Sequence, residues 1–436
     1  LKVYSPGQVV PLSDILPILE NLGLRVLGER PYRVRRQQQG DVWIHDFEIA
    51  RIDDQALDIE ADGENLRETL FRTWKGEVEN DGFNQLVLGT GLNWRELMLL
   101  RACFRYLKQV RLRYSQEYVV DALKANRPIV VVLVKLFRQR FDPGLTRTHT
   151  ETEETLINNL LEEVVSLDED RILRAMLDVI LAMLRTNYFQ PDAQGETKPY
   201  LSFKIDSAAV PRLPEPRPRY EIFVYSPRVE GIHLRGGSVA RGGLRWSDRL
   251  EDYRTEVLGL VKAQMVKNAV IVPVGSKGGF VPRRLPEGDR DAVQKEVIAW
   301  YSIFIEGLLD LTDNLVADKI VPPAHVVRHD SDDSYLVVAA DKGTATFSDI
   351  ANGISESRSF WLGDAFASGG SMGYDHKKMG ITERGAWESV KRLFRERGKD
   401  IQNSDFTVVG IGDMAGDVFG NGMLLSKHIR LQAAFN

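Results

Sequence analysis

The sequence predicts an α/β protein of several domains, and three observations carry this prediction. Its 436 residues are enough for two to four domains with sizeable cores. Beyond residue 199, strand-like apolar runs alternate with helical patterns, which is typical of an α/β architecture with parallel strands. Residues 1–56 instead combine one helix with two alternating runs, and residues 57–198 are mainly helical. We therefore expect an N-terminal α+β and helical region ahead of the α/β part.

The individual elements follow from periodicity and end signals. Asn93 and Ser115 stand where helix N-caps are expected. Polar segments with Pro or Gly, such as 142–151, are expected to be connections. The apolar spacing predicts helices at 12–22, 65–80, 93–114, 116–125, 151–184, 253–268, 291–309 and 382–397, and strands at 25–34, 41–52, 200–205, 220–224, 335–338 and 406–409.

Composition excludes several classes of function. A net charge of −5 gives no support to nucleic-acid binding. The longest apolar stretches, such as 129–134, are too short to cross a bilayer, and no signal peptide is seen. The single cysteine, Cys103, excludes an internal disulfide and fits a reducing cytoplasm. The seven histidines show no metal-ligand spacing: His325 and His329 are four apart, but no carboxylate stands at ligand spacing, so we expect no metal.

The run from Arg241 to Gly279 holds the strongest chemical signals. Lys277 follows the apolar run 269–274 and stands between glycines, so we expect a strand that ends in a glycine loop carrying an amine. A solvated turn lysine fits this pattern equally well. Gly278 excludes a phosphate-loop lysine, because that motif needs Ser or Thr there.

Two further cations accompany this lysine. Arg241 precedes Gly242 and Gly243, which would let a carboxylate approach its guanidinium closely. Gln264 and Lys267 continue the apolar face of the helix predicted at 253–268. A lysine at the end of such a stripe also suits a helix C-terminus without any ligand.

Two motifs follow predicted strands further along the chain. Asp341 comes three residues after the strand at 335–338, where open α/β sheets place catalytic groups, although a turn aspartate or helix cap is an alternative. After the strand at 406–409, the small residues fit a dinucleotide-binding turn followed by a helix. This turn consists of Gly410, Gly412, Asp413, Met414, Ala415 and Gly416. Asp413 brings negative charge near a pyrophosphate, and Gly420 and Gly422 weaken the helix.

Taken together, these motifs resemble the large bacterial class of NAD-specific glutamate dehydrogenases. The resemblance covers most of the chain. It is strongest in residues 236–279 and 339–344, and in the runs GYDHKKMGITERGAW and GIGDMAGDVFGNGMLLS. The upstream runs PLSDILPILENLGLRV and ENDGFNQLVLGTGLNWRE also resemble that class.

The resemblance implies a role for each of these residues. Lys277 matches the catalytic lysine, and Asp341 matches the aspartate that shuttles a proton to and from the amino group. Lys267 matches the lysine that binds the substrate α-carboxylate, with Gln264 beside it. Gly242 and Gly243 match glycines that line the substrate pocket, and Thr382 matches a threonine near the nicotinamide amide. The glycine turn from Gly410 to Gly416 matches the site that binds NAD.

One departure from the family pattern concerns the substrate side chain. The short glutamate enzymes carry a lysine where this chain has Arg241, and the related leucine enzymes have an apolar residue there. A cation at this position favours a dicarboxylic amino acid, because a buried unpaired charge would penalise an apolar side chain.

Three hypotheses for the function remain at this point. The leading one is oxidative deamination of L-glutamate to 2-oxoglutarate and ammonia with NAD. The same chemistry on another amino acid is the second, and a catalytically incomplete regulatory or assembly fragment of a larger subunit is the third. We expect a homo-oligomer, and an amino-acid effector acting at the N-terminal region.

The expected domains are four. They are a partial α+β regulatory-type module at 1–56, a helical region at 57–198, an α/β substrate-binding catalytic domain at 199–370, and the start of a truncated Rossmann-like dinucleotide domain at 371–436. The acid that would hold the ribose falls at or beyond Asn436, so the motif itself does not separate NAD from NADP.

Overall fold

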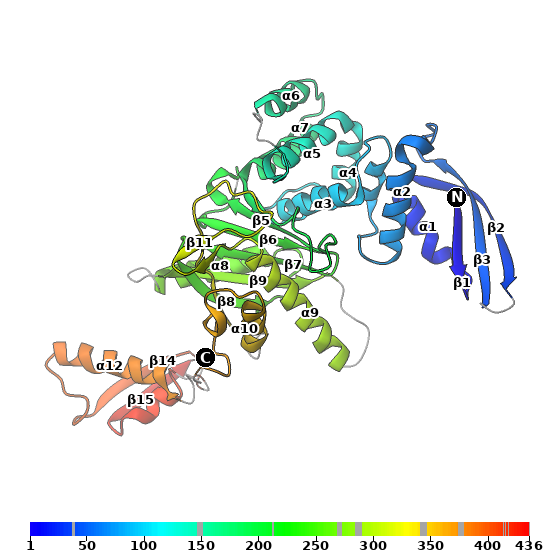
Figure 1. The fold of residues 1–436 in the computed structure, drawn as a ribbon. Coiled ribbons are helices and arrows are strands. Elements are labelled where there is room, and N and C mark those ends of the chain that lie inside the picture. Colours follow the sequence, from blue (N-terminus) through cyan, green and yellow to red (C-terminus); the bar gives the residue numbers. More distant parts are fainter. Residues whose placement is uncertain are drawn as a thin grey trace. The chain divides into compact units, whose positions relative to one another are not determined.

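The chain divides into two compact units, Leu1–Phe366 and Ala367–Asn436, and each is considered by itself (Figure 1). The structure is a computed structural model. It describes residues 1–36, 40–145, 151–211, 213–267, 273–283, 290–340, 347–373, 379–412, 414, 416 and 418–435.

The first unit begins with a small α+β layer. Its strands pair antiparallel in the order β1-β3-β2, and α1 buries Ile15, Ile18 and Leu19 in the same core as Phe47 of β3. The helix and the two strands predicted here are confirmed to within about two residues at each end, allowing for the usual fraying. The elements are β1 (Lys2–Pro6), α1 (Leu12–Asn21), β2 (Leu24–Arg36) and β3 (Gly40–Arg51).

A helical region follows, and its ends are set by caps. Asn93 accepts hydrogen bonds from the backbone N–H groups of Arg95 and Glu96, and the Glu96 carboxylate accepts one from Asn93 N–H in return. Ser115 accepts from Tyr118 N–H, so both predicted N-caps are confirmed. The elements are α2 (Ile59–Trp74), the 3₁₀ turn η1 (Gly82–Val87), α3 (Trp94–Gln109), α4 (Gln116–Ala125), α5 (Arg127–Phe141), α6 (Glu151–Glu162) and α7 (Leu167–Ala182).

The single helix predicted over 151–184 is wrong. Ser166 ends the continuous pattern, because its side chain accepts a hydrogen bond from Glu169 N–H and caps a new helix, α7. The chain then extends into a strand from Met183. Helix α5 was not predicted, since its β-branched run Ile129–Val134 has strand-like composition.

A large mixed sheet forms the centre of the first unit. Within residues 1–366 its strands follow the order β12-β8-β9-β7-β6-β5-β4. The two pairs β12–β8 and β8–β9 are parallel, whereas the pairs from β9 to β4 are antiparallel. The strands are β4 (Met183–Thr186), β5 (Leu201–Asp206), β6 (Tyr220–Tyr225), β7 (Val229–Arg235), β8 (Ala240–Trp246), β9 (Val274–Pro282) and β12 (Val337–Ala340).

The prediction of parallel pairing is therefore right for one side of the sheet and wrong for the other. Residues 226–228 are all that separate β6 from β7, and so short a connection permits only an antiparallel hairpin. A helix separates β8 from β9, and such a crossover is what a parallel pair requires.

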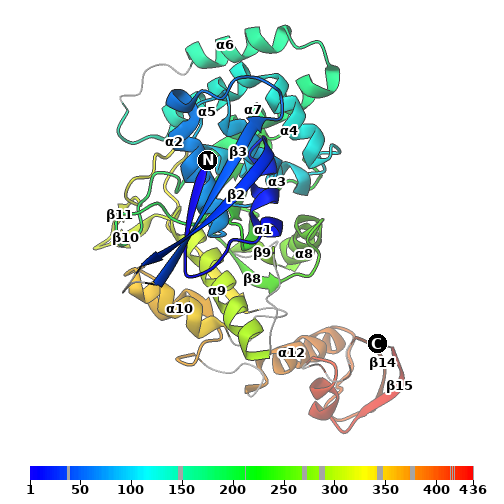
Figure 2. The same ribbon diagram turned by 90° about the vertical axis from the view of Figure 1, so that its right-hand side faces the viewer.

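Helices cover both faces of this sheet (Figure 2). Helix α8 (Tyr253–Lys267) lies on one face, where Val257 contacts the Gly279 position of β9. Helix α9 (Arg290–Leu309) lies on the other, where the Phe304 ring fills the space beside Gly231 of β7. The predicted α/β class, preceded by an α+β and helical region, is thus confirmed.

The remaining elements are the short ones of the first unit and all those of the second unit. The first unit also contains η2 (Ser207–Ala209), β10 (Asn314–Val316), β11 (Lys319–Val321), α10 (Ser348–Ser357) and η3 (Gly363–Ala365). The second contains β13 (Ala367–Ser368), α12 (Ile381–Glu396), β14 (Phe406–Ile411), η4 (Asn421–Leu425) and β15 (Ile429–Phe435), with β14 and β15 parallel. Among the described residues, no helix combines the length and apolar character needed to cross a membrane.

Candidate functional site

Lys277 lies in the middle of strand β9, not in a loop beyond the strand end as predicted. The side chain is half-buried, between the buried residues Ser276 and Gly278. The glycines around it suggested a loop because glycine weakens strands in general. Here they serve close packing, since a Cβ at Gly278 would lie 2.4 Å from Leu244 Cδ2 and one at Gly279 would lie 2.6 Å from Val257 Cγ2.

The structure brings Lys277, Arg241 and Gln264 to the same face of the sheet. Gly275 and Gly279 face α8, and Lys277 shares their side because side chains alternate along a strand. Arg241 of β8 stands beside Gly275 in the parallel register, so it belongs to this face as well. Because β8 and β9 are neighbours, this α8 face collects two cations from adjacent strands.

Gln264 approaches the same place from above the sheet. A Cβ at Gly275 would lie 2.8 Å from Gln264 Cγ, so this half-buried side chain rests directly on β9, next to Arg241 in register. Lys267 is the last residue of α8, three residues further on, which is the spacing of one helix face. Its backbone belongs to the described helix, whereas its side chain lies outside what the structure describes.

Gly242 has a packing reason of its own. A Cβ at this position would lie 1.6 Å from the carbonyl oxygen of Ser276, so a side chain here is incompatible with the spacing of β8 and β9. The sheet alone therefore requires Gly242, independently of any ligand. Gly243, which is also buried, stands next to Ala339 of β12.

The end of β12 lies beside these strands. Ala340 pairs in parallel with Leu244, so the carboxyl ends of β12 and β8 meet at the same edge of the sheet. Asp341 follows Ala340 immediately, outside the described residues, and its assignment stays a prediction. Among the described residues, no group of three or more His, Cys, Asp or Glu side chains could hold a metal ion.

On the face of the sheet opposite α8, a buried histidine and a buried ion pair lie behind the site. His233 of β7 pairs with Gly278 and is fully buried, and burial, helped by Arg235, lowers its pKa to about 3. Its ring is therefore neutral. The Arg235 guanidinium in turn donates to Asp333 Oδ2 at 2.7 Å. Sequence reasoning missed this pair, because the two residues are separated by 98 positions and neither stands in a recognisable motif.

The second unit contains the predicted dinucleotide turn. Gly410 lies on β14, and Gly412 directly after it has φ of +135°, a value that L side chains rarely adopt. Apart from its chain neighbours, no described atom lies within 4 Å of a Cβ built on Gly412, and the Gly412 N–H donates to the Phe435 carbonyl oxygen at 2.8 Å. The role of this turn in binding NAD stays a prediction. Asp413 and Ala415 lie outside the described residues.

The prediction of an α-helix after this turn is wrong for the described residues. The chain forms the 3₁₀ helix η4 instead of an α-helix, and a Cβ at Gly420 would lie 2.1 Å from the carbonyl oxygen of Met414. This close return of the backbone, with a second glycine at Gly422, disfavours a regular helix. Gly416 accepts from Gly420 N–H at 2.9 Å. Thr382 lies in the first turn of α12.

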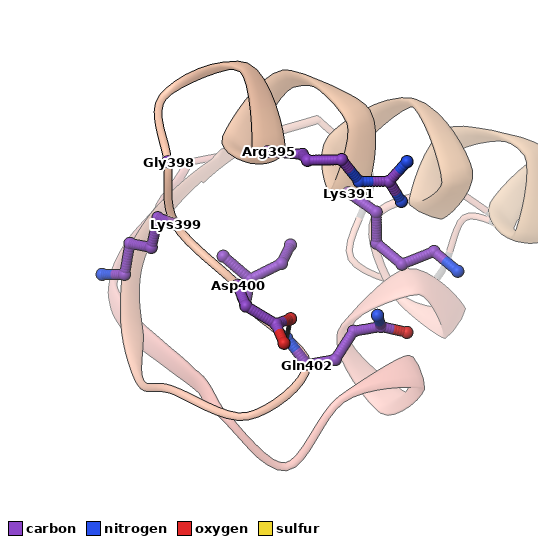
Figure 3. Close-up of a pocket in the computed structure, with 7 residues that line it drawn as sticks. Lys391, Arg395, Gly398, Lys399, Asp400 and Gln402 are labelled. Atoms are coloured by element: carbon purple, nitrogen blue, oxygen red, sulfur yellow. Dashed lines mark hydrogen bonds between the residues drawn. The ribbon is translucent and has the colours of Figure 1, made fainter.

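A cavity of about 380 Å³ lies elsewhere in the second unit (Figure 3). Its lining includes Lys391, Arg395 and Lys399, with Asp400 and Gln402 opposite. None of the residues predicted from sequence lines it. Arg395 stands in the last turn of α12, where positive charge stabilises the helix dipole, and Lys391 contacts Glu388 at 2.6 Å. We assign this cavity no role in the chemistry.

Three family descriptions match the chain in succession. "Bacterial NAD-glutamate dehydrogenase, catalytic domain" matches residues 156–436, which is more than half of the chain. "Glutamate dehydrogenase, helical motif 3" matches residues 78–143, and "Glutamate dehydrogenase, ACT3 domain" matches residues 1–61.

Curated relatives match over the whole chain. The NAD-specific glutamate dehydrogenase of Pseudomonas aeruginosa is 61% identical over 442 aligned residues, and that of Halomonas elongata is 59% identical over 439. The enzyme of the same name from Mycobacterium tuberculosis is 54% identical over 454. All of this chain is covered in each comparison, yet it spans only 27 to 28% of the length of these relatives.

Proposed function

Because this chain belongs to the bacterial NAD-glutamate dehydrogenase family, we propose that its protein oxidatively deaminates L-glutamate to 2-oxoglutarate and ammonia, with NAD as hydride acceptor. The observation that carries the proposal is the gathering of Arg241, Gln264 and Lys277 on the α8 face of neighbouring strands. Each of the three residues stands in a motif that the sequence alone predicts to be functional, and they are 23 and 13 positions apart along the chain.

Two cations would hold the substrate. The exposed Arg241 reaches a side-chain carboxylate, since its planar fork makes two parallel hydrogen bonds. Lys267, at the end of α8, binds the α-carboxylate beside Gln264. Fixing both ends of a dicarboxylic amino acid orients its Cα–H bond, which supplies much of the rate of such a reaction.

The remaining residues would handle protons and water. Asp341 takes a proton from the substrate ammonium group, and the Cα hydride leaves with its electron pair, giving an iminium. Lys277 orients the water that attacks the iminium carbon and stabilises the developing charge until ammonia leaves. NAD supplies the acceptor for the hydride when it is bound. Gly412 would leave room for its phosphates because it has no side chain, while its own N–H donates to the Phe435 carbonyl oxygen at 2.8 Å.

A lysine variant tests the catalytic assignment. In the full-length protein, Lys277→Ala should lower kcat by about 10²–10⁴-fold, the usual contribution of a proton-transfer group. The dissociation constant for NAD, measured by calorimetry, should stay unchanged because Lys277 and the glycine turn belong to different units. A kcat near that of the wild type would remove Lys277 from the mechanism.

The substrate is tested at Arg241. Loss of the cation in Arg241→Leu should lower kcat/KM for glutamate by more than about tenfold, the value of one discriminating contact, and should raise the ratio of leucine to glutamate turnover. If neither kcat/KM for glutamate nor this ratio changed in the variant, another amino acid would be favoured as the substrate.

The N-terminal region is proposed to regulate the enzyme. The ACT3 match at residues 1–61 supports an amino-acid effector acting there, and we infer a homo-oligomer as the working form. We retain the four-part division at residues 56, 198 and 370, and a cytoplasmic location, which rests on the one buried, reduced cysteine. Effector titrations of the full-length enzyme, with light scattering for its mass, test these proposals.

A further inference from the structure

One buried guanidinium at the end of β7 bonds the two segments that lead to Arg241 and to Asp341. Arg235, the last residue of β7, has no exposed surface. It donates to Asp333 Oδ2 at 2.7 Å, to the Tyr335 carbonyl oxygen at 2.8 Å, and to the Ser238 carbonyl oxygen. Ser238 lies in the turn that enters β8, three residues before Arg241, and Tyr335 lies two residues before β12.

The carboxylate that Arg235 holds is charged and fixed. Burial alone would raise the pKa of Asp333, but Arg235 and Lys204 together keep it below its ordinary value. Lys204 of β5 donates to Asp333 Oδ2 at 2.6 Å, and the Asp333 N–H donates to Asp313 Oδ2 at 2.7 Å. The segment that enters β12 is therefore anchored to the middle of the sheet through several charge-assisted bonds.

Strand β12 is short. It has four residues and pairs with β8, and its Val338 N–H donates to the Phe366 carbonyl oxygen at 2.9 Å. Its register places Val337 beside Arg241 and Ala340 beside Leu244. Any shift of β12 along β8 would move Ala340, the residue before Asp341, relative to Arg241.

We infer that Arg235 is a positioning residue: it sets β12 against β8, and through them the spacing between the proton-transfer group and the substrate cation. This inference rests on the proposed function, because it concerns the geometry of that same site. Reactions of this kind lose up to about 100-fold in rate when a reacting group is misplaced by about 1 Å.

Arg185 of β4 offers a matched control. It has no exposed surface either, and it donates to Asp313 at 2.9 Å, to Asp330 at 2.6 Å and to the Ser331 carbonyl oxygen at 2.8 Å. It therefore belongs to the same buried ionic cluster, but it bonds neither the turn before β8 nor Tyr335. Arg185→Lys and Arg235→Lys each keep the charge and lose the planar fork.

The experiment compares these two variants in the full-length enzyme. Both should lower Tm by similar amounts. Only Arg235→Lys should lower kcat by about 10- to 100-fold, with KM for NAD unchanged and a larger kinetic isotope effect on glutamate deuterated at Cα, because hydride transfer becomes slower. Equal kcat and isotope effects in the two variants would overturn the inference.

A second variant guards against failed folding. Asp333→Asn keeps the side-chain shape and should show the same kinetic signature as Arg235→Lys; kinetics like those of Arg185→Lys would contradict the inference. If the proposed function itself were wrong, the result would differ, because the wild-type protein would not oxidise glutamate at all.

Discussion

Gln264 of α8 rests directly on Gly275 of β9. A Cβ at position 275 would lie 2.8 Å from Gln264 Cγ, 2.9 Å from the Gln264 carbonyl carbon and 3.0 Å from Met265 N. Two of these three atoms are helix backbone, so rotating a side chain would not relieve the contact. The glycine thus fixes how closely the helix that carries Gln264 and Lys267 approaches the strand that carries Lys277.

Gly275→Ala should therefore push α8 away from the sheet. We expect a loss of about 1–3 kcal/mol in the free energy of unfolding, as for an overpacked core, together with a raised KM for glutamate. Denaturant unfolding and steady-state kinetics measure the two effects. Gly259→Ala is the control, because Gly259 is exposed on the same helix and no described atom outside that helix's own backbone lies within 4 Å of its added Cβ. That variant should gain about 0.5–1 kcal/mol; equal losses in both would contradict the packing argument.

The buried pair Arg254–Glu221 gives a second prediction. Arg254 Nε donates to Glu221 Oε2 at 2.9 Å and Nη2 donates to Oε1, while the Tyr106 hydroxyl donates to Oε2 at 3.2 Å. Arg254→Met leaves the buried Glu221 carboxylate without its cation and should cost about 3–5 kcal/mol. The double variant Arg254→Met, Glu221→Gln should recover part of this loss. Additive effects in the double-mutant cycle, measured by urea unfolding, would show that the pair does not act as a unit.

His233 predicts how stability responds to acid. Burial lowers the pKa of its ring to about 3, whereas the unfolded chain titrates near 6.5. Above pH of about 6.5 neither state binds the proton, but between about 6.5 and 3 only the unfolded state does, so the free energy of unfolding falls as pH falls. The slope contributed is about 1.4 kcal/mol per pH unit.

The variant His233→Leu should lack this contribution. Unfolding curves at several pH values between 4 and 7, on the wild type and the variant, measure the difference in slope, which corresponds to about one proton. Arg235 and Asp333, the charged groups nearest the ring, are unchanged in both proteins. Identical slopes would mean that His233 is protonated in the folded state.

Cys103 predicts a chemical behaviour. It is fully buried in α3, and burial raises the pKa of its thiol to about 12. Since the thiolate is the reactive form, a thiol reagent should not modify the folded protein and should modify one cysteine after unfolding in guanidinium. Rapid labelling of the native protein would show that α3 opens locally.

Local features of the fold could be predicted from sequence, whereas the contacts that build the site could not. The caps at Asn93 and Ser115 depend on residues within three positions, and the face of α8 that carries Val257 and Val261 depends on helical spacing. The prediction put Lys277 in a loop because glycine-rich strands and glycine-rich loops have similar sequences. The packing contacts that require the glycines come from distant residues and cannot be seen in the sequence. The Arg235–Asp333 contact joins residues 98 positions apart, and no local pattern specifies it.

The tight glycine packing of β8 and β9 also limits how this protein could be redesigned. Gly242, Gly275 and Gly278 admit no side chain without moving backbone or core atoms. Arg241 and Lys277 stand on the α8 face together with Gly275, whereas Gly242 and Gly278 belong to the opposite face. A library intended to change substrate preference should therefore vary Arg241 and Gln264 on an unaltered glycine framework, because those substitutions change chemistry without changing the distance between the strands.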